Sequence, residues 1–262
     1  MGHLSDGNVL TELSEFYKSF DGVKGYIGYS ELGKPVFFFA VEKTLYPVII
    51  AQYAIHAREY VTSYLAMRQI ELFKKNGRRG TVYFIPAANP DGIEVALTEN
   101  PLYKANARGV DLNVNFDARW GTGRFNKFRP GDSDYVGESA FSESETRALR
   151  DFTLFIRPDS TISYHAKGEE IYWEFYQDEQ RRKRDYVLAK KLSDVTGYPL
   201  KGAANSAGGY KDWCIEKLKI PAFTFEVGRD ELSHPLGKEH AAEITETNKG
   251  VLNAITEAFG KI

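Results

Sequence analysis

The stretch Ile49-Ile50-Ala51-Gln52-Tyr53-Ala54-Ile55-His56-Ala57-Arg58-Glu59-Tyr60 joins a buried strand to the start of a helix. The run over 47–55 is nearly all apolar, which is typical of a central strand covered on both faces. His56 falls at the end of this strand, and Glu59 falls in the first turn of the helix. Both side chains can therefore converge on one cation, and zinc accepts imidazole nitrogen and carboxylate oxygen as ligands.

The other apolar runs and their turn signals predict a layered α/β fold. Strands are expected over 25–30, 35–41, 47–55, 81–86, 161–165 and 220–227. Helices are expected over 59–75, 142–155, 179–196, 210–218 and 238–259. This alternation predicts a three-layer α/β/α sandwich around a central mixed, mostly parallel sheet of about eight strands. The length allows all of it to form a single domain over 1–262.

Three connecting segments carry further expectations. Residues 31–34 should join the first two strands as a hairpin, and Ser142-Glu143-Ser144-Glu145 fits a capping box at the start of a helix. Residues 87–136 are rich in Gly, Asn, Asp and Arg and show little periodicity. A structureless loop of that length inside a compact domain is usually functional.

Composition excludes several classes of function. The formal net charge of −2 provides no basic field that would favour nucleic acid or an anionic membrane. No run reaches the ~20 apolar residues that span a bilayer, and residues 1–8 lack the apolar core of a signal peptide. Cys214 is the only cysteine, which excludes an internal disulfide and suits a reducing compartment. We therefore expect a cytoplasmic protein, with secretion after removal of a signal as the open alternative; the oligomeric state is not predicted.

Two further residues complete a catalytic zinc site. His165 ends the strand over 161–165, and Glu226 lies in the apolar run Phe223-Thr224-Phe225-Glu226-Val227. Open α/β sheets build their sites at the carboxyl ends of strands, so both side chains should meet the His56 and Glu59 pair. A carboxylate buried without a partner costs several kcal/mol, which indicates a function for Glu226. We predict one zinc ion held by His56, Glu59 and His165, with Glu226 as general base and then general acid.

Taken together, these motifs resemble the zinc carboxypeptidase A family. His56-Ala57-Arg58-Glu59 is similar to its metal motif, His165 to its distant third ligand, and Phe223-Thr224-Phe225-Glu226 to its catalytic glutamate strand. Asn89-Pro90-Asp91-Gly92 and Gly109-Val110-Asp111-Leu112-Asn113 are similar to two further family loops, all in the family's order over 25–226. The resemblance implies a metallopeptidase that hydrolyses an amide bond with a zinc-activated water.

The resemblance also implies roles for other residues. Asp111 corresponds to the carboxylate that hydrogen-bonds the first zinc histidine, and Asn113 to a residue that holds the terminal carboxylate of the substrate. Lys104, or alternatively Arg108, falls near the cation that stabilises the oxyanion of the transition state. Arg108 and Tyr210 are also candidate substrate contacts, with packing as the other interpretation of Tyr210.

Two departures from the digestive members concern how the substrate is held. Val114 stands where they place an arginine that clamps the terminal carboxylate, and Ala204 stands where they place a mobile covering tyrosine. Valine cannot form the bidentate pair that arginine makes with a carboxylate. The arginines of the long loop are candidate replacements for this clamp, namely Arg119, Arg124 and Arg129.

Segments 103–113 and 207–213 are similar to a bacterial branch of the family that cleaves γ-D-glutamyl bonds to diamino acids in peptidoglycan stem peptides. Lys211 then falls at the specificity-pocket position, where a cation suits a substrate with an extra carboxylate. We predict a γ-D-glutamyl-meso-diaminopimelate peptidase acting on peptides or muropeptides, without nucleic-acid or membrane partners. A conventional metallocarboxypeptidase and a non-catalytic protein that retains the metal are the two alternatives.

Overall fold

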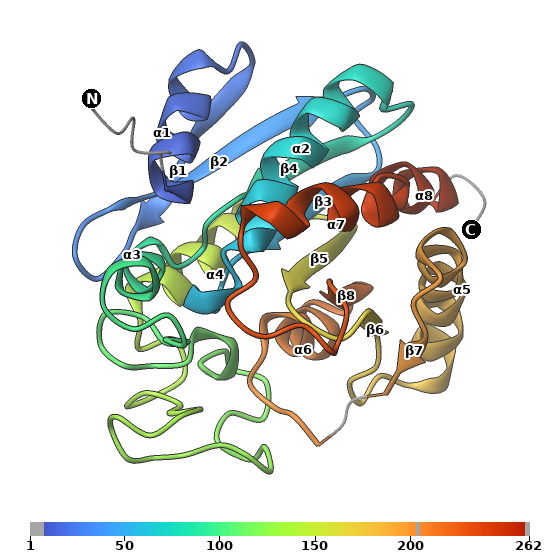
Figure 1. Cartoon of the computed structure of the whole chain (residues 1–262). Helices are drawn as coiled ribbons and strands as arrows, with labels where there is room; N and C mark the ends of the chain where they lie inside the picture. Colours follow the sequence, from blue (N-terminus) through green and yellow to red (C-terminus); the bar gives the residue numbers. More distant parts are fainter. Residues whose placement is uncertain (1–7, 203–204, 260–262) are drawn as a thin grey trace, which may run out of the picture.

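In the computed structural model, which describes residues 8–202 and 205–259, an eight-stranded mixed sheet forms the centre of the molecule (Figure 1). Its strand order is β1-β2-β4-β3-β5-β8-β6-β7. The strands are β1 (Val23–Tyr29), β2 (Pro35–Glu42), β3 (Val48–Tyr53), β4 (Thr81–Ile85), β5 (Ser160–His165), β6 (Glu170–Tyr172), β7 (Leu200–Lys201) and β8 (Ala222–Glu226). The four central strands β4, β3, β5 and β8 run parallel, while β1–β2, β2–β4 and β6–β8 pair antiparallel. The sheet predicted from the sequence is confirmed.

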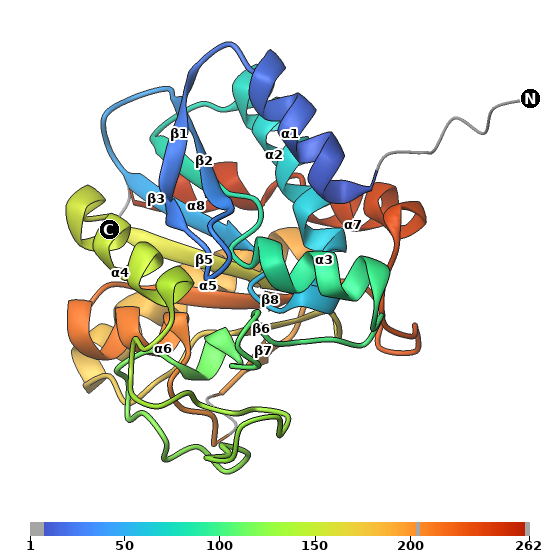
Figure 2. The same ribbon diagram turned by 90° about the vertical axis from the view of Figure 1, so that its left-hand side faces the viewer.

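Helices cover both faces of this sheet (Figures 1 and 2). They are α1 (Val9–Ser19), α2 (Val61–Asn76), α3 (Pro90–Thr98), α4 (Ser144–Ile156), α5 (Glu179–Thr196), α6 (Tyr210–Trp213), α7 (Ala241–Asn248) and α8 (Val251–Ala258). Among the residues that the structure describes, no helix is both long and apolar enough to cross a membrane.

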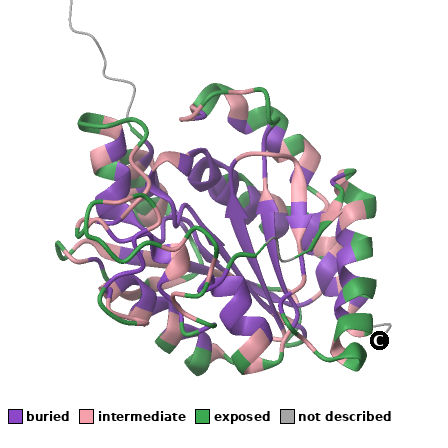
Figure 3. Cartoon of the chain, turned by 90° about the horizontal axis from the view of Figure 1, so that it is seen from below, coloured by how far each residue is buried: buried purple, intermediate pink, exposed green. Residues whose placement is uncertain are grey.

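Two apolar cores separate the three layers. Along β3, Ile49 and Ala51 face one core, which α1, α2, α5, α7 and α8 complete. Ile50 faces the other core, which α4 and α6 complete. Alternate residues of a strand point to opposite faces, so an unbroken apolar run is what a strand between two cores requires. Figure 3 shows the result, with central strands buried and the outer helix faces exposed.

The structure differs from the sequence-based expectations in its short elements. α1, β6 and β7 were not predicted from the sequence. The strands β6 and β7 are too short to show the alternation with a period of two that marks a strand. The long loop holds a helix, α3, which Asn89 caps by accepting a hydrogen bond from the Gly92 N–H at 3.0 Å. The predicted helix over 238–259 is divided into a 3-10 turn, α7 and α8, with a break at Lys249 and Gly250.

The predicted capping box of α4 is wrong. Glu143 is the N-cap residue, and its side chain makes no capping bond. The first turn is instead capped from the β1–β2 hairpin, where a Glu31 carboxylate oxygen accepts the Ser144 N–H at 2.6 Å. A local motif was expected, but a residue more than a hundred positions away supplies the carboxylate.

Strand register brings distant residues to one edge of the sheet. β3 and β5 pair with Tyr53 opposite Tyr164, and β5 and β8 pair with His165 opposite Glu226. The two tyrosine rings stack with centroids 4.7 Å apart, and Gln69 of α2 bonds both hydroxyls. Because parallel strands end at the same edge, the residues that follow β3 and those that end β5 and β8 lie together.

Candidate metal centre and active site

The three predicted metal ligands converge at this edge. His56 Nδ1 lies 2.9 Å from one oxygen of Glu59, and His165 Nδ1 lies 3.0 Å from the other. The two Nδ1 atoms are 3.1 Å apart. All three side chains are buried, and their ligand atoms lie within 4.8 Å of one another. One ion placed among these atoms can therefore contact all three residues.

The chain beyond β3 is shaped to make this convergence possible. Ala54 has a positive φ of 50°, which turns the backbone out of the strand. Its N–H donates to the Thr62 hydroxyl at 2.9 Å, and that hydroxyl donates to the Glu59 carbonyl at 2.8 Å. A 3-10 turn over Ala57–Glu59 then places Glu59 beside His56, whereas the sequence predicted an α-helical first turn.

Asn89, near the start of the long loop, connects the segment after β3 to a later part of the same loop. The Asn89 amide donates to the carbonyls of Ile55 and Ala105 at 3.1 and 3.0 Å. Gly92 lets this approach occur, because a Cβ there would lie 2.3 Å from the Ala105 carbonyl oxygen. The Ala57 N–H also donates to the Lys104 carbonyl at 3.0 Å. These bonds hold the segment that carries Lys104 and Asp111 against His56.

Asp111 fixes the orientation of the first histidine. One of its oxygens lies 3.1 Å from His56 Nε2, and the other lies 2.7 Å from Lys104 Nζ. Burial alone raises the pKa of Asp111, but Lys104 and His56 outweigh it and hold the pKa well below its ordinary value. An ionised Asp111 accepts the Nε2 proton of His56, which leaves Nδ1 to face Glu59 and His165.

We expect Asp111→Asn to weaken zinc binding about 10- to 100-fold, because an amide orients the imidazole less firmly and makes it a poorer ligand. Competition with a chromophoric chelator measures the change. Asp134→Asn is the matched control, because Asp134 also pairs with Lys104, at 2.6 Å, but lies beyond it from His56. Equal zinc affinity in the Asp111→Asn variant and the wild type would remove this role.

The donor set at the centre fits zinc. With the His56 proton on Nε2, the lone pair of Nδ1 faces a carboxylate oxygen and a second imidazole nitrogen. A divalent cation can take the place of a proton among these atoms, and two imidazoles with one carboxylate form a catalytic zinc donor set. Burial lowers the pKa of His56, but Glu59 and Asp111 raise it to about 9. Near neutral pH the metal-free imidazole therefore carries a proton on Nδ1 as well. A bound metal must displace this Nδ1 proton, so zinc affinity should increase with pH.

Glu226 ends β8 beside the third ligand, in register with His165. Burial raises its pKa well above the ordinary value, and the nearby negative charge of Glu59 adds to the effect. Glu226 lines a cavity of about 240 Å³ with Asn113, Lys211 and Asp212. A carboxylate of raised basicity that faces a cavity can take up a proton during a reaction.

A second cavity, of about 170 Å³, lies against His56, one of the three predicted metal ligands. His56, Lys104, Asp111 and Val114 line it. Asn113 lines both cavities, and its side-chain oxygen accepts the Tyr210 N–H at 3.2 Å. Of the two alternative cations, Lys104 is therefore the one that lines a cavity together with a metal ligand.

The structure does not bring the Tyr210 side chain to either cavity. It is fully buried in the second core, and its hydroxyl shares a 2.8 Å hydrogen bond with Thr153. The packing interpretation of this tyrosine fits that placement, and only its backbone N–H reaches Asn113. Ala204, the position of the expected covering tyrosine, lies outside the described residues.

The arginines of the long loop lie farther out. Arg119 and Arg124 line a neighbouring recess of about 340 Å³, and Arg129 is exposed. Sequence reasoning missed other residues that line the cavities, above all Asp212, Tyr172, Thr224 and Asp134. Asp212 directly follows the predicted site residue Lys211, so it could have been predicted from the sequence. Tyr172 comes from β6, an edge strand that left no periodic pattern.

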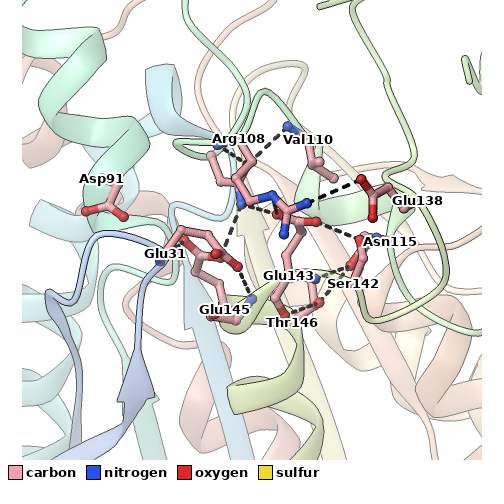
Figure 4. A network of polar contacts seen from close by, with 12 residues as sticks. Glu31, Asp91, Arg108, Val110, Asn115, Glu138, Ser142, Glu143, Glu145 and Thr146 are labelled. Carbon is pink, nitrogen blue, oxygen red and sulfur yellow. Dashed lines mark hydrogen bonds and ion pairs between the residues drawn. The ribbon is translucent and has the colours of Figure 1, made fainter. Parts of the chain in front are cut away.

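Arg108 also lies away from the metal ligands, in a polar network that anchors the long loop (Figure 4). Its guanidinium lies 3.7 Å from Glu138 and 3.8 Å from Glu143. The Asn106 amide donates to the buried carboxylates of Glu143 and Glu145, at 2.8 and 3.2 Å. The partners of Arg108 thus belong to this network, and its role as a substrate contact stays a prediction.

Glu145 should make stability depend on pH. Burial raises its pKa from 4.5 to about 7, against the hydrogen bonds that it accepts. The folded protein thus retains a proton that the unfolded chain releases, and this contribution is complete below pH 4.5 and is lost as the pH rises through 7. Glu145→Gln should abolish this pH dependence, which amounts to at most about 3 kcal/mol in the free energy of unfolding.

Urea unfolding of the wild type and of Glu145→Gln between pH 4.5 and 8 measures this difference. Glu138→Gln is the control, because Glu138 is mostly exposed and belongs to the same network. A difference between wild type and Glu145→Gln that stays constant with pH would show that Glu145 does not titrate in this range.

Comparison with known proteins agrees with this geometry. A family model described as zinc carboxypeptidase matches residues 21–250. Gamma-D-glutamyl-L-diamino acid endopeptidase 1 of Lysinibacillus sphaericus is 30% identical over 211 residues, which make up 67% of this chain and 53% of that protein. The chain thus spans about half the length of this relative.

Two solved structures share the fold. Bovine thrombin-activatable fibrinolysis inhibitor, solved with a tick carboxypeptidase inhibitor, matches with a TM-score of 0.84 at 19% identity over 97% of both chains. Murein-tripeptide amidase from Escherichia coli O157 matches with a TM-score of 0.65 at 23% identity, over 92% of this chain and 95% of that one. At these identities the likeness concerns the fold alone. The family model, which spans most of the sequence, identifies the chain as a member of the zinc carboxypeptidase family of metallopeptidases.

Proposed function

We propose that this protein is a zinc peptidase that hydrolyses the bond between γ-D-glutamate and a diamino acid in peptidoglycan-derived peptides. One observation carries the choice of substrate: Lys211, a buried cation, lines the same cavity as Glu226. Such a cation suits a substrate with a carboxylate beyond the one at its terminus. The 30% identity to an endopeptidase named for γ-D-glutamyl-L-diamino acid bonds supports the same choice.

Zinc held by His56, Glu59 and His165 would polarise the scissile carbonyl and lower the pKa of a water molecule. Glu226 accepts a proton from the attacking water and later delivers it to the leaving nitrogen. The C–O bond forms and the C–N bond breaks, without a covalent enzyme intermediate. The raised pKa of Glu226 favours this exchange, because a stronger base accepts the water proton more readily.

Two other residues hold the reacting groups. Among the residues that the structure describes, Lys104 uses two of its three N–H donors on Asp111 and Asp134, so one donor remains for the developing oxyanion. Asn113 lines both cavities, and its side-chain oxygen accepts the Tyr210 N–H, which leaves its NH2 group to donate to a substrate carboxylate. Val114 lines the cavity beside His56, and its side chain offers no polar group there.

A conventional metallocarboxypeptidase is the second candidate, favoured by the placement of Asn113 between the cavities. The apolar Val114 argues against it, because a terminal carboxylate would then lack an arginine at this position. A non-catalytic binding protein is the least supported of the three, because binding alone needs no basic carboxylate beside His165.

We expect the zinc-loaded protein to release diaminopimelate-containing product from L-alanyl-γ-D-glutamyl-meso-diaminopimelate, as measured by liquid chromatography and mass spectrometry. Benzoylglycyl-phenylalanine, a substrate for release of an ordinary C-terminal amino acid, should be cleaved at least about 100-fold more slowly, because its phenyl side chain offers no carboxylate to Lys211. Fast cleavage of benzoylglycyl-phenylalanine with none of the tripeptide would instead establish the conventional carboxypeptidase.

A further inference from the structure

Lys211 and Asp212 form a buried pair of opposite charges in the cavity that holds Glu226. They are 6% and 2% exposed, and Lys211 Nζ lies 2.5 Å from a carboxylate oxygen of Asp212. Removing two charges from water costs several kcal/mol per ion, and their mutual attraction seldom gives a net gain in stability. A buried pair that lines a cavity therefore favours recognition of a ligand as its role.

Both groups retain capacity for further hydrogen bonds. Among the described residues, the Lys211 ammonium uses two of its three donors, on Asp212 and on the Glu174 carbonyl at 3.0 Å. The Asp212 carboxylate accepts from Lys211 and from the Gly209 N–H at 3.2 Å, which leaves about two of its four lone-pair positions. The pair can thus donate to one group of a ligand and accept from another.

We propose that Lys211 and Asp212 recognise a zwitterion, an ammonium and a carboxylate on the same carbon. This inference rests on the proposed function and specifies its diamino acid. The far end of meso-diaminopimelate is such a zwitterion, with its carboxylate for Lys211 and its ammonium for Asp212. The other carboxylate of diaminopimelate remains for Asn113, which lines the same cavity.

Charge balance explains why the pair selects this ligand. A lysine side chain ends in an ammonium alone, which would meet the like charge of Lys211. A side chain that ends in a carboxylate alone would bring a second negative charge to the pair, with no ammonium to balance it. Each mismatch buries an uncompensated charge, which is how binding sites reject near-relatives of their ligand. The pair therefore selects diaminopimelate over lysine.

The test compares kcat/KM for three dipeptides in which γ-D-glutamate precedes meso-diaminopimelate, L-lysine or L-2-aminopimelate. The last of these has the carboxylate but lacks the second ammonium. We expect the wild type to prefer diaminopimelate by about 100-fold or more over both others. This comparison uses the unaltered protein, so it does not depend on the folding of a variant.

Two variants assign the selection to the pair. Asp212→Asn keeps an acceptor for the Gly209 N–H, and it should raise KM for diaminopimelate about 100-fold and lower KM for the aminopimelate substrate, whose carboxylate then no longer meets a negative charge. Lys211→Met should weaken both carboxylate-bearing substrates and spare the lysine substrate. Lys217→Met is the control, because Lys217 follows on the same helical segment but is half-exposed and pairs with Asp117.

The outcomes separate the two proposals. Equal cleavage of the lysine and diaminopimelate substrates by the wild type would overturn the zwitterion site and leave the proposed function intact. Equal loss of all three substrates in Asp212→Asn, with zinc content retained, would assign Asp212 to capping of its helix and overturn the inference. If the wild type cleaves none of the three, the proposed function fails and this inference with it.

Discussion

Glu226→Gln should lower kcat by about 10²- to 10⁴-fold, the range expected for loss of a general acid–base. Glutamine has nearly the same shape as glutamate, but its amide cannot take a proton from water or return one to the leaving nitrogen. The carboxylate lies in register with His165 and is not one of the three converging ligands, so zinc content should stay at one ion per chain. Steady-state kinetics with metal analysis of the same sample measures both quantities.

Glu170→Gln is the matched control for this variant. Glu170 lies opposite Glu226 in the β6–β8 pair, but its carboxylate bonds the Tyr172 hydroxyl at 2.6 Å and pairs with Lys201 at 3.2 Å. Its substitution should change kcat little. A Glu226→Gln variant that keeps more than about a tenth of the wild-type kcat would show that another group is the base.

His165→Ala should lower zinc affinity by at least about 100-fold and abolish hydrolysis with it. Loss of a group that only orients a ligand costs 10- to 100-fold in affinity, so loss of a ligand must cost more. The variant leaves Glu59 without its 3.0 Å partner and the site with two donors, too few for a catalytic zinc. Isothermal titration with zinc, followed by activity at saturating zinc, measures the effect.

His240→Ala is the control for this variant. His240 is a partly exposed imidazole in the 3-10 turn before α7, and its partner is Glu239 at 3.5 Å. Zinc affinity and activity should remain as in the wild type. Undiminished hydrolysis by His165→Ala after treatment with a chelator would contradict a metal-dependent reaction.

The convergence of His56, Glu59 and His165 could be predicted because each one follows or ends an apolar strand. Three strands of a parallel sheet finish at the same edge, so strand ends far apart in sequence become neighbours in space. The register that aligns His165 with Glu226 required only that both strands lie side by side. Asp111 could be placed from its family motif, and the 3.1 Å distance to His56 agrees with that placement.

Other residues could not be placed from the sequence, because their contacts are decided by tertiary packing. Tyr210 follows two glycines beside predicted site residues, yet its ring lies in the core behind the cavity, where Thr153 bonds it. Arg108 belongs to the loop that carries Asp111, but its guanidinium lies 3.8 Å from the buried carboxylate of Glu143 (Figure 4). Sequence proximity indicated the loop correctly and did not indicate the direction of the side chain.

The short elements escaped for a related reason. A strand of two or three residues shows no alternation, and β6 and β7 acquire their conformation from pairing with β8 and with each other. They matter for function, because Tyr172 of β6 lines the cavity with Glu226. The wall of the specificity cavity is therefore the part of the site that depends most on the folded structure.

A crystal of the zinc-loaded protein, measured at the zinc absorption edge, gives the most direct test of the metal centre. We expect a single anomalous peak bounded by His56 Nδ1, His165 Nδ1 and the Glu59 carboxylate, at about 2.0–2.2 Å from each ligand atom. A peak at the cluster of three carboxylates formed by Glu31, Glu143 and Glu145, with none between the two histidines, would contradict it.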